Sequence, residues 1–251
     1  MFNTMLEQLN KHFDHYSIHA RFMPAFFICL PLVFTTVAWY PDSKTIFGGI
    51  MTVLISFGVM SFLSVIISNM GNSIQRNYFN RWGGAPIILL FMPDNDEIDQ
   101  YTKKRYFKWL NSKIPDLNLS LDQDDKSDLQ QKIRSATNFL REYTRDKKKY
   151  PAIYRDNVAY GFSRNLVAIK YVGLAMSIIS LVVNVAVIFY PDYFQLISGQ
   201  NSTYSVTFLG VAALTVSVLS IFLLLFVVNE SFVKQRAYRY ARSLLEICEM
   251  N

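Results

Sequence analysis

The sequence predicts an all-α membrane protein with four transmembrane helices, arranged as two tandem-repeat hairpins with a small, mainly helical cytoplasmic domain inserted between them. Three observations support this prediction: four long uncharged stretches, basic residues concentrated on one side of them, and similar residues at matching places in the two hairpins. The composition agrees, because 51% of the 251 residues are hydrophobic and only 18% are charged, whereas about a quarter of the residues in soluble domains are charged.

Each uncharged stretch reaches the roughly 18 to 20 residues that a helix needs to cross a hydrocarbon core. The stretches are apolar on every side, which argues against the one-sided helices of a soluble core. They cover residues 22–39, 45–70, 171–190 and 202–229. The expected organisation is an amphipathic cytoplasmic segment 1–21, hairpin 22–70, cytoplasmic domain 71–166, hairpin 167–229 and a cytoplasmic C-terminal helix 230–251.

The basic residues predict how the chain is oriented. Of the 25 lysines and arginines, only Lys44 lies in an expected outer turn. All the others precede the first stretch, follow the last one or lie between the hairpins. Because loops rich in Lys and Arg stay in the cytoplasm, both termini and the central segment are expected there.

The two hairpins resemble each other at two places. Tyr-Pro-Asp occurs at 40–42 and again at 190–192, in the expected outer turns. An Asn and a Gln are six residues apart after the second stretch, at 69 and 75, and after the fourth, at 229 and 235. A duplication of an even number of spans gives two copies in the same orientation, as in proteins with parallel repeats.

The central segment contains a short apolar run bounded by prolines, 85–93, which is expected to be a strand or an extended buried segment. Helical spacing predicts helices over 98–112 and 122–148, the second with Asp122 or Asp124 as its N-cap. A further helix is expected to begin at Pro151 and to continue into the third stretch, with Gly161 as a weak point.

Three clusters mix basic and aromatic residues, at 103–109, 141–149 and 160–165. This mixture suits phosphate binding with base stacking, although solvated helix faces and contacts with anionic lipid are equally ordinary explanations. The candidate nucleic-acid-binding residues are Lys104, Arg105, Tyr106, Arg141, Tyr143 and Arg145, with Trp109 as a further stacking surface. Arg164 and Asn165 are expected to couple the domain to the third stretch.

Polar residues recur along two of the stretches. They can line a pore or form hydrogen bonds that hold helices together, and the spacing leaves both open. The candidate pore-lining residues are Ser56, Ser64, Ser68 and Asn184. No charged residue lies deep in any stretch, which disfavours a proton-coupled pump and leaves a channel open.

No motif predicts an enzyme, a cofactor or a metal centre. His12, His15 and His19 share one helix face, where a metal site or pH sensor is conceivable. An interfacial helix with its imidazoles among lipid headgroups explains them better. Cys29 and Cys248 are expected to be free thiols.

Four short sequence motifs in the central segment resemble those of a known family. They are Arg-Trp-Gly-Gly-Ala-Pro at 81–86, Thr-Lys-Lys-Arg-Tyr at 102–106, Leu-Arg-Glu-Tyr-Thr-Arg-Asp at 140–146 and Asn-Val-Ala-Tyr-Gly-Phe-Ser-Arg-Asn-Leu at 157–166. In this order between two hairpins, they resemble a bacterial four-span family that includes membrane effectors of anti-phage defence, such as the channel component of Hailong-type systems. One departure is Ile87-Ile88, where the family pattern has hydroxyl residues after the Pro, so any ligand contact through those hydroxyls is in doubt.

The resemblance implies a multi-pass protein of the bacterial inner membrane that forms a homo-oligomeric channel, with a tetramer favoured. A single-stranded DNA oligomer or a nucleotide on the cytoplasmic side would control opening, and a nucleotidyltransferase would be encoded nearby. Opening would depolarise the membrane. The alternative is a non-channel membrane adaptor that recruits a cytoplasmic partner protein.

Overall fold

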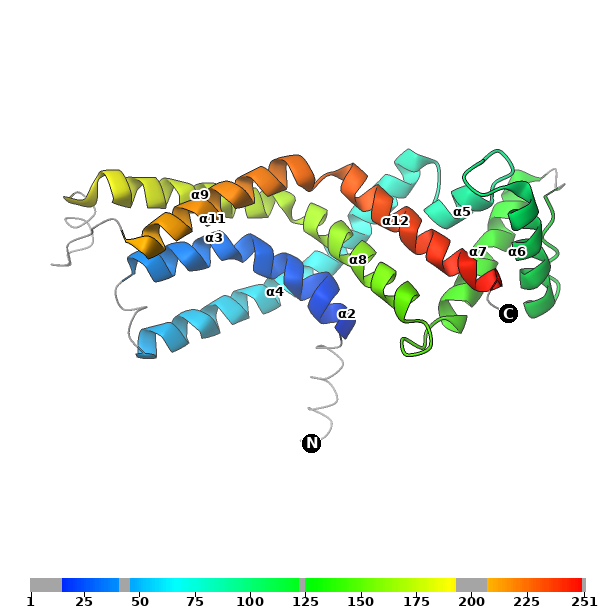
Figure 1. Ribbon diagram of the computed structural model, residues 1–251, viewed down its shortest axis with the longest axis horizontal. Helices are drawn as coiled ribbons and strands as arrows, with labels where there is room; N and C mark the ends of the chain where they lie inside the picture. Colours follow the sequence, from blue (N-terminus) through cyan, green and yellow to red (C-terminus); the bar gives the residue numbers. More distant parts are fainter. Residues whose placement is uncertain (1–14, 41–45, 122–124, 193–206, 250–251) are drawn as a thin grey trace, which may run out of the picture. The chain divides into compact units, whose positions relative to one another are not determined.

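The computed structural model describes residues 15–40, 46–121, 125–192 and 207–249 (Figure 1). Every regular element within these residues is a helix, which confirms the expected helical class. The chain divides into two compact units, and each is described by itself. Unit 1 comprises Met1–Ser73 and Gly161–Phe232, and unit 2 comprises Ile74–Tyr160 and Val233–Asn251.

Three helical stretches of unit 1 are long and apolar enough to cross a membrane. The first, His15–Trp39, consists of α2 (His15–Ser17), a π-helical turn (Ile18–Phe22) and α3 (Met23–Trp39). The second is α9 (Lys170–Phe189), and the third joins α11 (Phe208–Phe222) to a π-helical turn (Leu223–Val227). A multi-pass membrane protein is compatible with these three stretches.

The remaining expected span falls on α4 (Ile46–Trp82), a helix of 37 residues. Several side chains in its first half lie outside the described residues. The fourth span and the tandem repeat therefore stay predictions.

In unit 1, α3, α9 and α11 pack against one another (Figure 1). Two glycines make this close packing possible. A Cβ on Gly173 of α9 would lie 2.6 Å from Cγ2 of Ile28, and one on Gly210 of α11 would lie 2.4 Å from the Trp39 ring. Small residues at such positions let membrane helices approach closely.

The helix α8 (Pro151–Ala168) begins at the proline, as expected. It ends at Ala168, and Ile169, with a φ of −105° and a ψ of 10°, separates it from α9. Gly161 is therefore not the weak point, because it lies inside α8. A Cβ there would lie 2.6 Å from the Tyr16 hydroxyl oxygen, so the glycine provides room for a neighbour.

Unit 2 contains the last turns of α4, then α5 (Pro86–Phe91), α6 (Gln100–Lys113), α7 (Lys126–Tyr143) and the first half of α8. Most of α12 (Glu230–Leu245) and a final 3₁₀ turn (Glu246–Glu249) complete it. Their apolar faces form one core. On α7 the core residues are Leu129, Ile133, Ala136 and Leu140, at the spacing of one helix face.

Two expectations for this unit are wrong in detail. The run at 85–93 forms the short helix α5, because Pro86 fits the first helical turn and Ile87, Ile88, Leu90 and Phe91 then fill the core. The α7 N-cap is Asp125, whose carboxylate accepts from the Ser127 amide at 2.8 Å. The expected caps at 122 and 124 lie outside the described residues, and the helix ends at Tyr143 rather than 148.

The loop between α5 and α6 is held by one buried lysine. Lys103 is 0% exposed, and its ammonium donates to the carbonyl oxygens of Met92, at 2.7 Å, and Asn95. Burial lowers the pKa of Lys103, and the carboxylates of Asp96, Asp94 and Asp99 oppose that shift.

Candidate functional site

A groove of ≈ 570 Å³ lies in unit 2 among the end of α4, the loop after it, α5 and α7. Two guanidinium groups and four carboxamides line it beside an apolar wall, and no carboxylate does. The lining residues are Gln75, Phe79, Asn80, Gly83, Gly84, Ala85, Ile87, Ile88, Gln130, Arg134, Thr137, Asn138 and Arg141. We call it the arginine groove.

One stripe of α7 supplies both arginines of the groove. Arg134 and Arg141 are seven residues apart, or about two helical turns, and Asn138 lies between them on the same side. The adjoining face of α7 is fixed in the core by Ile133 and Leu140, both 0% exposed. The packing of the apolar face therefore turns the arginines toward the groove.

The two arginines are not neutralised within the described part of the chain, where neither Arg134 nor Arg141 forms an ion pair. Glu142, the nearest acid in sequence, is bound to Arg145 at 2.6 Å. Two guanidinium groups without a carboxylate create a positive potential, and each can bind a phosphate through two parallel hydrogen bonds.

The loop at one end of the groove depends on two glycines. Gly83 has a φ of +84° and Gly84 a φ of +156°. Residues with a Cβ atom rarely adopt these angles. The Gly84 amide donates to the Phe79 carbonyl at 2.8 Å and closes the end of α4. Ile87 and Ile88 follow this loop and line the groove, so its wall is apolar there.

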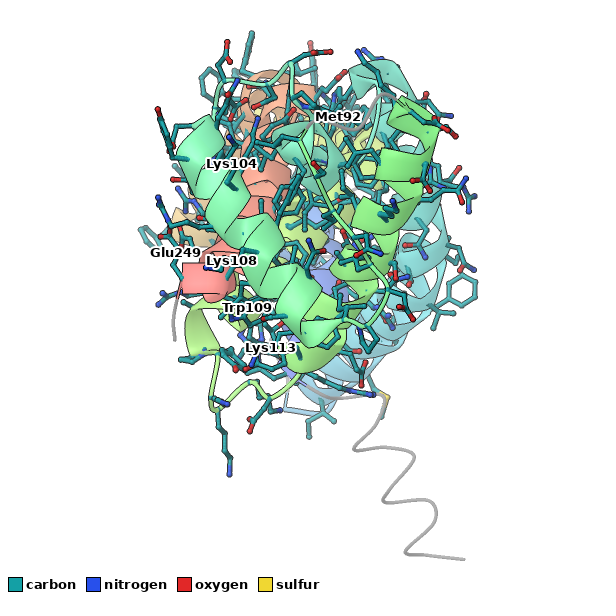
Figure 2. All side chains as sticks on the ribbon, turned by 90° about the vertical axis from the view of Figure 1, so that its right-hand side faces the viewer. Met92, Lys104, Lys108, Trp109, Lys113 and Glu249 are labelled. Atoms are coloured by element: carbon teal, nitrogen blue, oxygen red, sulfur yellow. The ribbon has the colours of Figure 1, made fainter. Side chains whose placement is uncertain are left out.

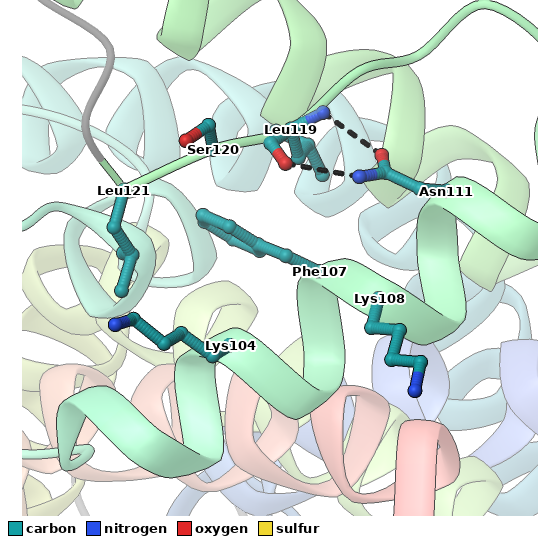
Figure 3. Close-up of a pocket in the computed structure, with 7 residues that line it drawn as sticks. All are labelled: Lys104, Phe107, Lys108, Asn111, Leu119, Ser120 and Leu121. Carbon is teal, nitrogen blue, oxygen red and sulfur yellow. Dashed lines mark hydrogen bonds between the residues drawn. The ribbon is translucent and has the colours of Figure 1, made fainter.

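A second hollow, of ≈ 330 Å³, lies beside α6 (Figure 3). Asn111 shapes it, because its carboxamide accepts from the Leu119 amide at 2.8 Å and donates to the Leu119 carbonyl at 2.9 Å. Lys104 lies beside Leu121, whereas Lys108 points away from that loop (Figure 3). With Lys113, these lysines follow one another along α6 (Figure 2).

Two other candidates have internal partners or are buried. Arg105 donates to Glu249 at 2.7 Å and to the Thr102 hydroxyl at 2.8 Å. Tyr106 is 5% exposed and packs against Phe91, and burial raises the pKa of its phenol to about 12. The expectation that Tyr106 offers a stacking surface is therefore wrong, because the ring fills the core.

Tyr143 belongs to an aromatic cluster on unit 2. It stacks on Phe139 at a centroid distance of 5.7 Å and meets Trp109 edge to face at 5.7 Å. The Lys149 ammonium lies 5.8 Å from the centre of the Tyr143 ring. Tyr143 is exposed and Trp109 is partly buried, so these rings present a limited surface with a cation already over it.

The expected coupling residues lie in unit 1. Asn165 is fully buried, and its side-chain amide donates to the Ala20 carbonyl at 2.6 Å. The bond ties α8 to the first candidate membrane stretch. Arg164, next to it, is partly buried.

Asn184 lies at the centre of the three packed helices of unit 1 and is 0% exposed. Its carbonyl oxygen accepts from the Trp39 indole N–H at 2.6 Å. Its amide nitrogen donates to the hydroxyls of Thr35, at 3.0 Å, and Ser217, at 3.2 Å. Asn184 thus bonds α9 to α3 and α11. Ser64 and Ser68 on α4 are partly buried, and the Ser56 side chain lies outside the described residues.

The histidine and cysteine expectations are covered only in part. His15 and His19 stack at a centroid distance of 4.1 Å, and the described residues hold no cluster of three potential metal-binding side chains. His12 lies outside those residues. Cys29 and Cys248 are both buried and not paired in a disulfide.

The three clusters of basic and aromatic residues do not include Arg134. Its signal is the seven-residue spacing to Arg141 on a strongly one-sided helix. Comparison with protein-family models, with curated proteins and with solved structures finds no match for the chain. Any statement of function therefore depends on the residues and their geometry.

Proposed function

We propose that this chain is a membrane effector of bacterial anti-phage defence, an oligomeric channel of the inner membrane controlled by a phosphate-bearing ligand on its cytoplasmic domain. The observation that carries the ligand-binding part is the arginine groove, whose lining has two guanidinium groups, four carboxamides and no carboxylate, and whose arginines form no ion pair with any described residue. The ligand class is a nucleotide or a single-stranded DNA oligomer.

The chemistry of the groove supports this ligand class. Guanidinium groups bind phosphate oxygens in a matching planar geometry. Carboxamides donate and accept at once, which suits the edges of nucleobases, and the apolar wall formed by Phe79, Ile87 and Ile88 suits a base face. The volume of ≈ 570 Å³ falls in the usual range of ligand pockets.

The channel part is supported by the helices of unit 1. Its three candidate membrane stretches are apolar, and the expected fourth span, 45–70, is uncharged as well. In this proposal both termini are cytoplasmic and several copies, four being favoured, surround the pore. Asn184 belongs to the packing inside each copy, and residues of α4 such as Ser64 and Ser68 are the remaining candidates for the pore.

Binding of a fluorescent single-stranded oligonucleotide to the detergent-purified protein tests the ligand part. Arg141→Ala removes one charged contact, which is worth about 1.5–3 kcal/mol, so the dissociation constant is expected to rise about tenfold or more. Arg134→Ala is expected to act alike. Arg145→Ala is the matched control, because Arg145 is exposed and bound to Glu142 outside the groove, and it is expected to change binding less than about twofold.

Equal losses in Arg141→Ala and Arg145→Ala would place the ligand elsewhere. A purified protein that carries and binds no nucleic acid or nucleotide would favour the adaptor alternative. The channel part has its own test: expression without any inhibitory oligomer is expected to depolarise the cell membrane, and an unchanged membrane potential contradicts it. A nucleotidyltransferase gene beside the coding sequence would support the proposal.

A further inference from the structure

A second group of cations in unit 2 lies on aromatic rings rather than in a groove. Tyr78 and Trp82, in the last turns of α4, stack at a centroid distance of 5.5 Å and an angle of 17°. Arg81 lies 5.7 Å from the Tyr78 ring centre, and Lys234 of α12 lies 5.9 Å from Trp82 and 5.7 Å from Tyr238. We call these five residues the cation–aromatic cluster.

The chain places this cluster close to a membrane surface. Lys234 follows Val227, the last residue of a candidate membrane stretch, by seven residues. Seven residues rise about 10 Å where the chain is helical and span about 24 Å at most. Trp82 and Tyr238 contact Lys234. Trp and Tyr are enriched where hydrocarbon meets water.

The charged members of the cluster are both positive, and the nearest acid in sequence is Glu230, which precedes Lys234 by four residues on α12. Arg81 and Lys234 are exposed, and Lys234 has no ion-pair partner in the described part of the chain. The acid near Tyr238 is Glu97, which is bound to Arg242. The exposed Lys234 ammonium, which lies over an indole ring, is therefore available to an external phosphate.

We infer that the cation–aromatic cluster binds the headgroup of an anionic phospholipid. Lys234 meets the phosphate, and the rings of Trp82 and Tyr238 lie against the glycerol and the first methylene groups. Phosphatidylglycerol supplies this chemistry, with one negative charge on a headgroup at the membrane surface. The inference is independent of the ligand proposed for the arginine groove.

Native mass spectrometry of the full chain in detergent, titrated with phosphatidylglycerol or phosphatidylcholine, tests the inference. The wild type is expected to bind phosphatidylglycerol in preference. Lys234→Ala is expected to weaken the first binding step about fivefold, as for the loss of one basic residue at an anionic surface. Lys234→Arg keeps the charge and is expected to bind like the wild type.

Lys113→Ala is the matched control. Lys113 also lies over an indole, 5.7 Å from the Trp109 ring centre, but far along the chain from any candidate span. Equal phosphatidylglycerol binding by the wild type and Lys234→Ala overturns the inference, and so do equal losses in Lys234→Ala and Lys113→Ala. Lack of preference over phosphatidylcholine also overturns it. Soluble glycerol phosphate bound through Lys234 as strongly as the lipid would assign the cluster to a soluble ligand.

Discussion

Asn184 in unit 1 and Lys103 in unit 2 are both polar and both 0% exposed, but they hold different kinds of structure together. Asn184 bonds side chains on two other helices, at positions 149, 145 and 33 residues away along the chain. Lys103 bonds two carbonyl oxygens of its own preceding loop, 11 and 8 residues away. One buried group joins distant elements, and the other fixes a local turn.

The difference fits helices apolar enough to cross a membrane in unit 1 and one-sided helices around a core in unit 2. In a membrane the hydrophobic effect does not draw helices together, so hydrogen bonds and close packing select their partners. In a water-exposed domain, burial of apolar surface holds the helices together. The loop before Lys103 instead needs a donor for its carbonyl oxygens. A lysine can bond these carbonyl oxygens because its ammonium offers three donors on a flexible stem.

The largest expected effect is that of Lys103→Ala. The substitution leaves a cavity and removes a donor from the buried carbonyls, which together cost about 3 kcal/mol of stability. Hydrogen exchange is expected to show lost protection confined to residues 92–103. Lys103→Met, which keeps most of the stem, is expected to lose about half as much. Lost protection throughout unit 2 in both variants would mean that Lys103 does more than fix the loop.

A smaller effect is expected for Asn184→Ala. Each hydrogen bond between membrane helices is worth about 0.6 kcal/mol on average, so three amount to about 2 kcal/mol. The lost exchange protection is expected in α3, α9 and α11 together. Ser180→Ala is the matched control, because Ser180 is equally buried on α9 and its hydroxyl has no hydrogen-bond partner among the residues that the structure describes. If both variants behave alike, the bonds of Asn184 do not join the three helices.

The smallest effect is expected for Glu249→Gln, which weakens the ion pair with Arg105. Both side chains are largely exposed, at 43% and 59%, so water and salt screen the attraction. The melting temperature is expected to match that of Glu246→Gln, which removes an exposed charge that has no ion pair among the described residues. A clear loss of stability in Glu249→Gln alone would contradict this prediction, because it would show that the exposed ion pair contributes substantially to stability.

Much of the fold follows from local patterns in the sequence. The stretch 171–190 became α9, and the spacing over 98–112 became α6, each within two residues at both ends. Tyr106 could not be assigned correctly from its neighbours. It stands between Arg105 and Phe107, and only the core shows that Tyr106 and Phe107 both point inward while Arg105 is exposed.

The candidate site was predicted less completely than the helices. Arg141 was found because it stands in a basic run, and Arg134 was missed because it stands alone. Their common groove depends on α4 and α5, which approach α7 through the tertiary fold. No spacing within one segment can show such a meeting.

The core of unit 2 has a consequence for how the chain is made. Its apolar residues come from two separate parts of the chain, and Leu244, Leu245 and Ile247 follow the last candidate membrane stretch. On a ribosome that proceeds from the N-terminus, α5, α6 and α7 emerge long before these residues. The core of unit 2 therefore stays incomplete until the last candidate membrane stretch and the residues after it have been synthesised. The lining of the arginine groove ends at Arg141 in the sequence, so the groove residues are all synthesised before the residues that complete the core behind them.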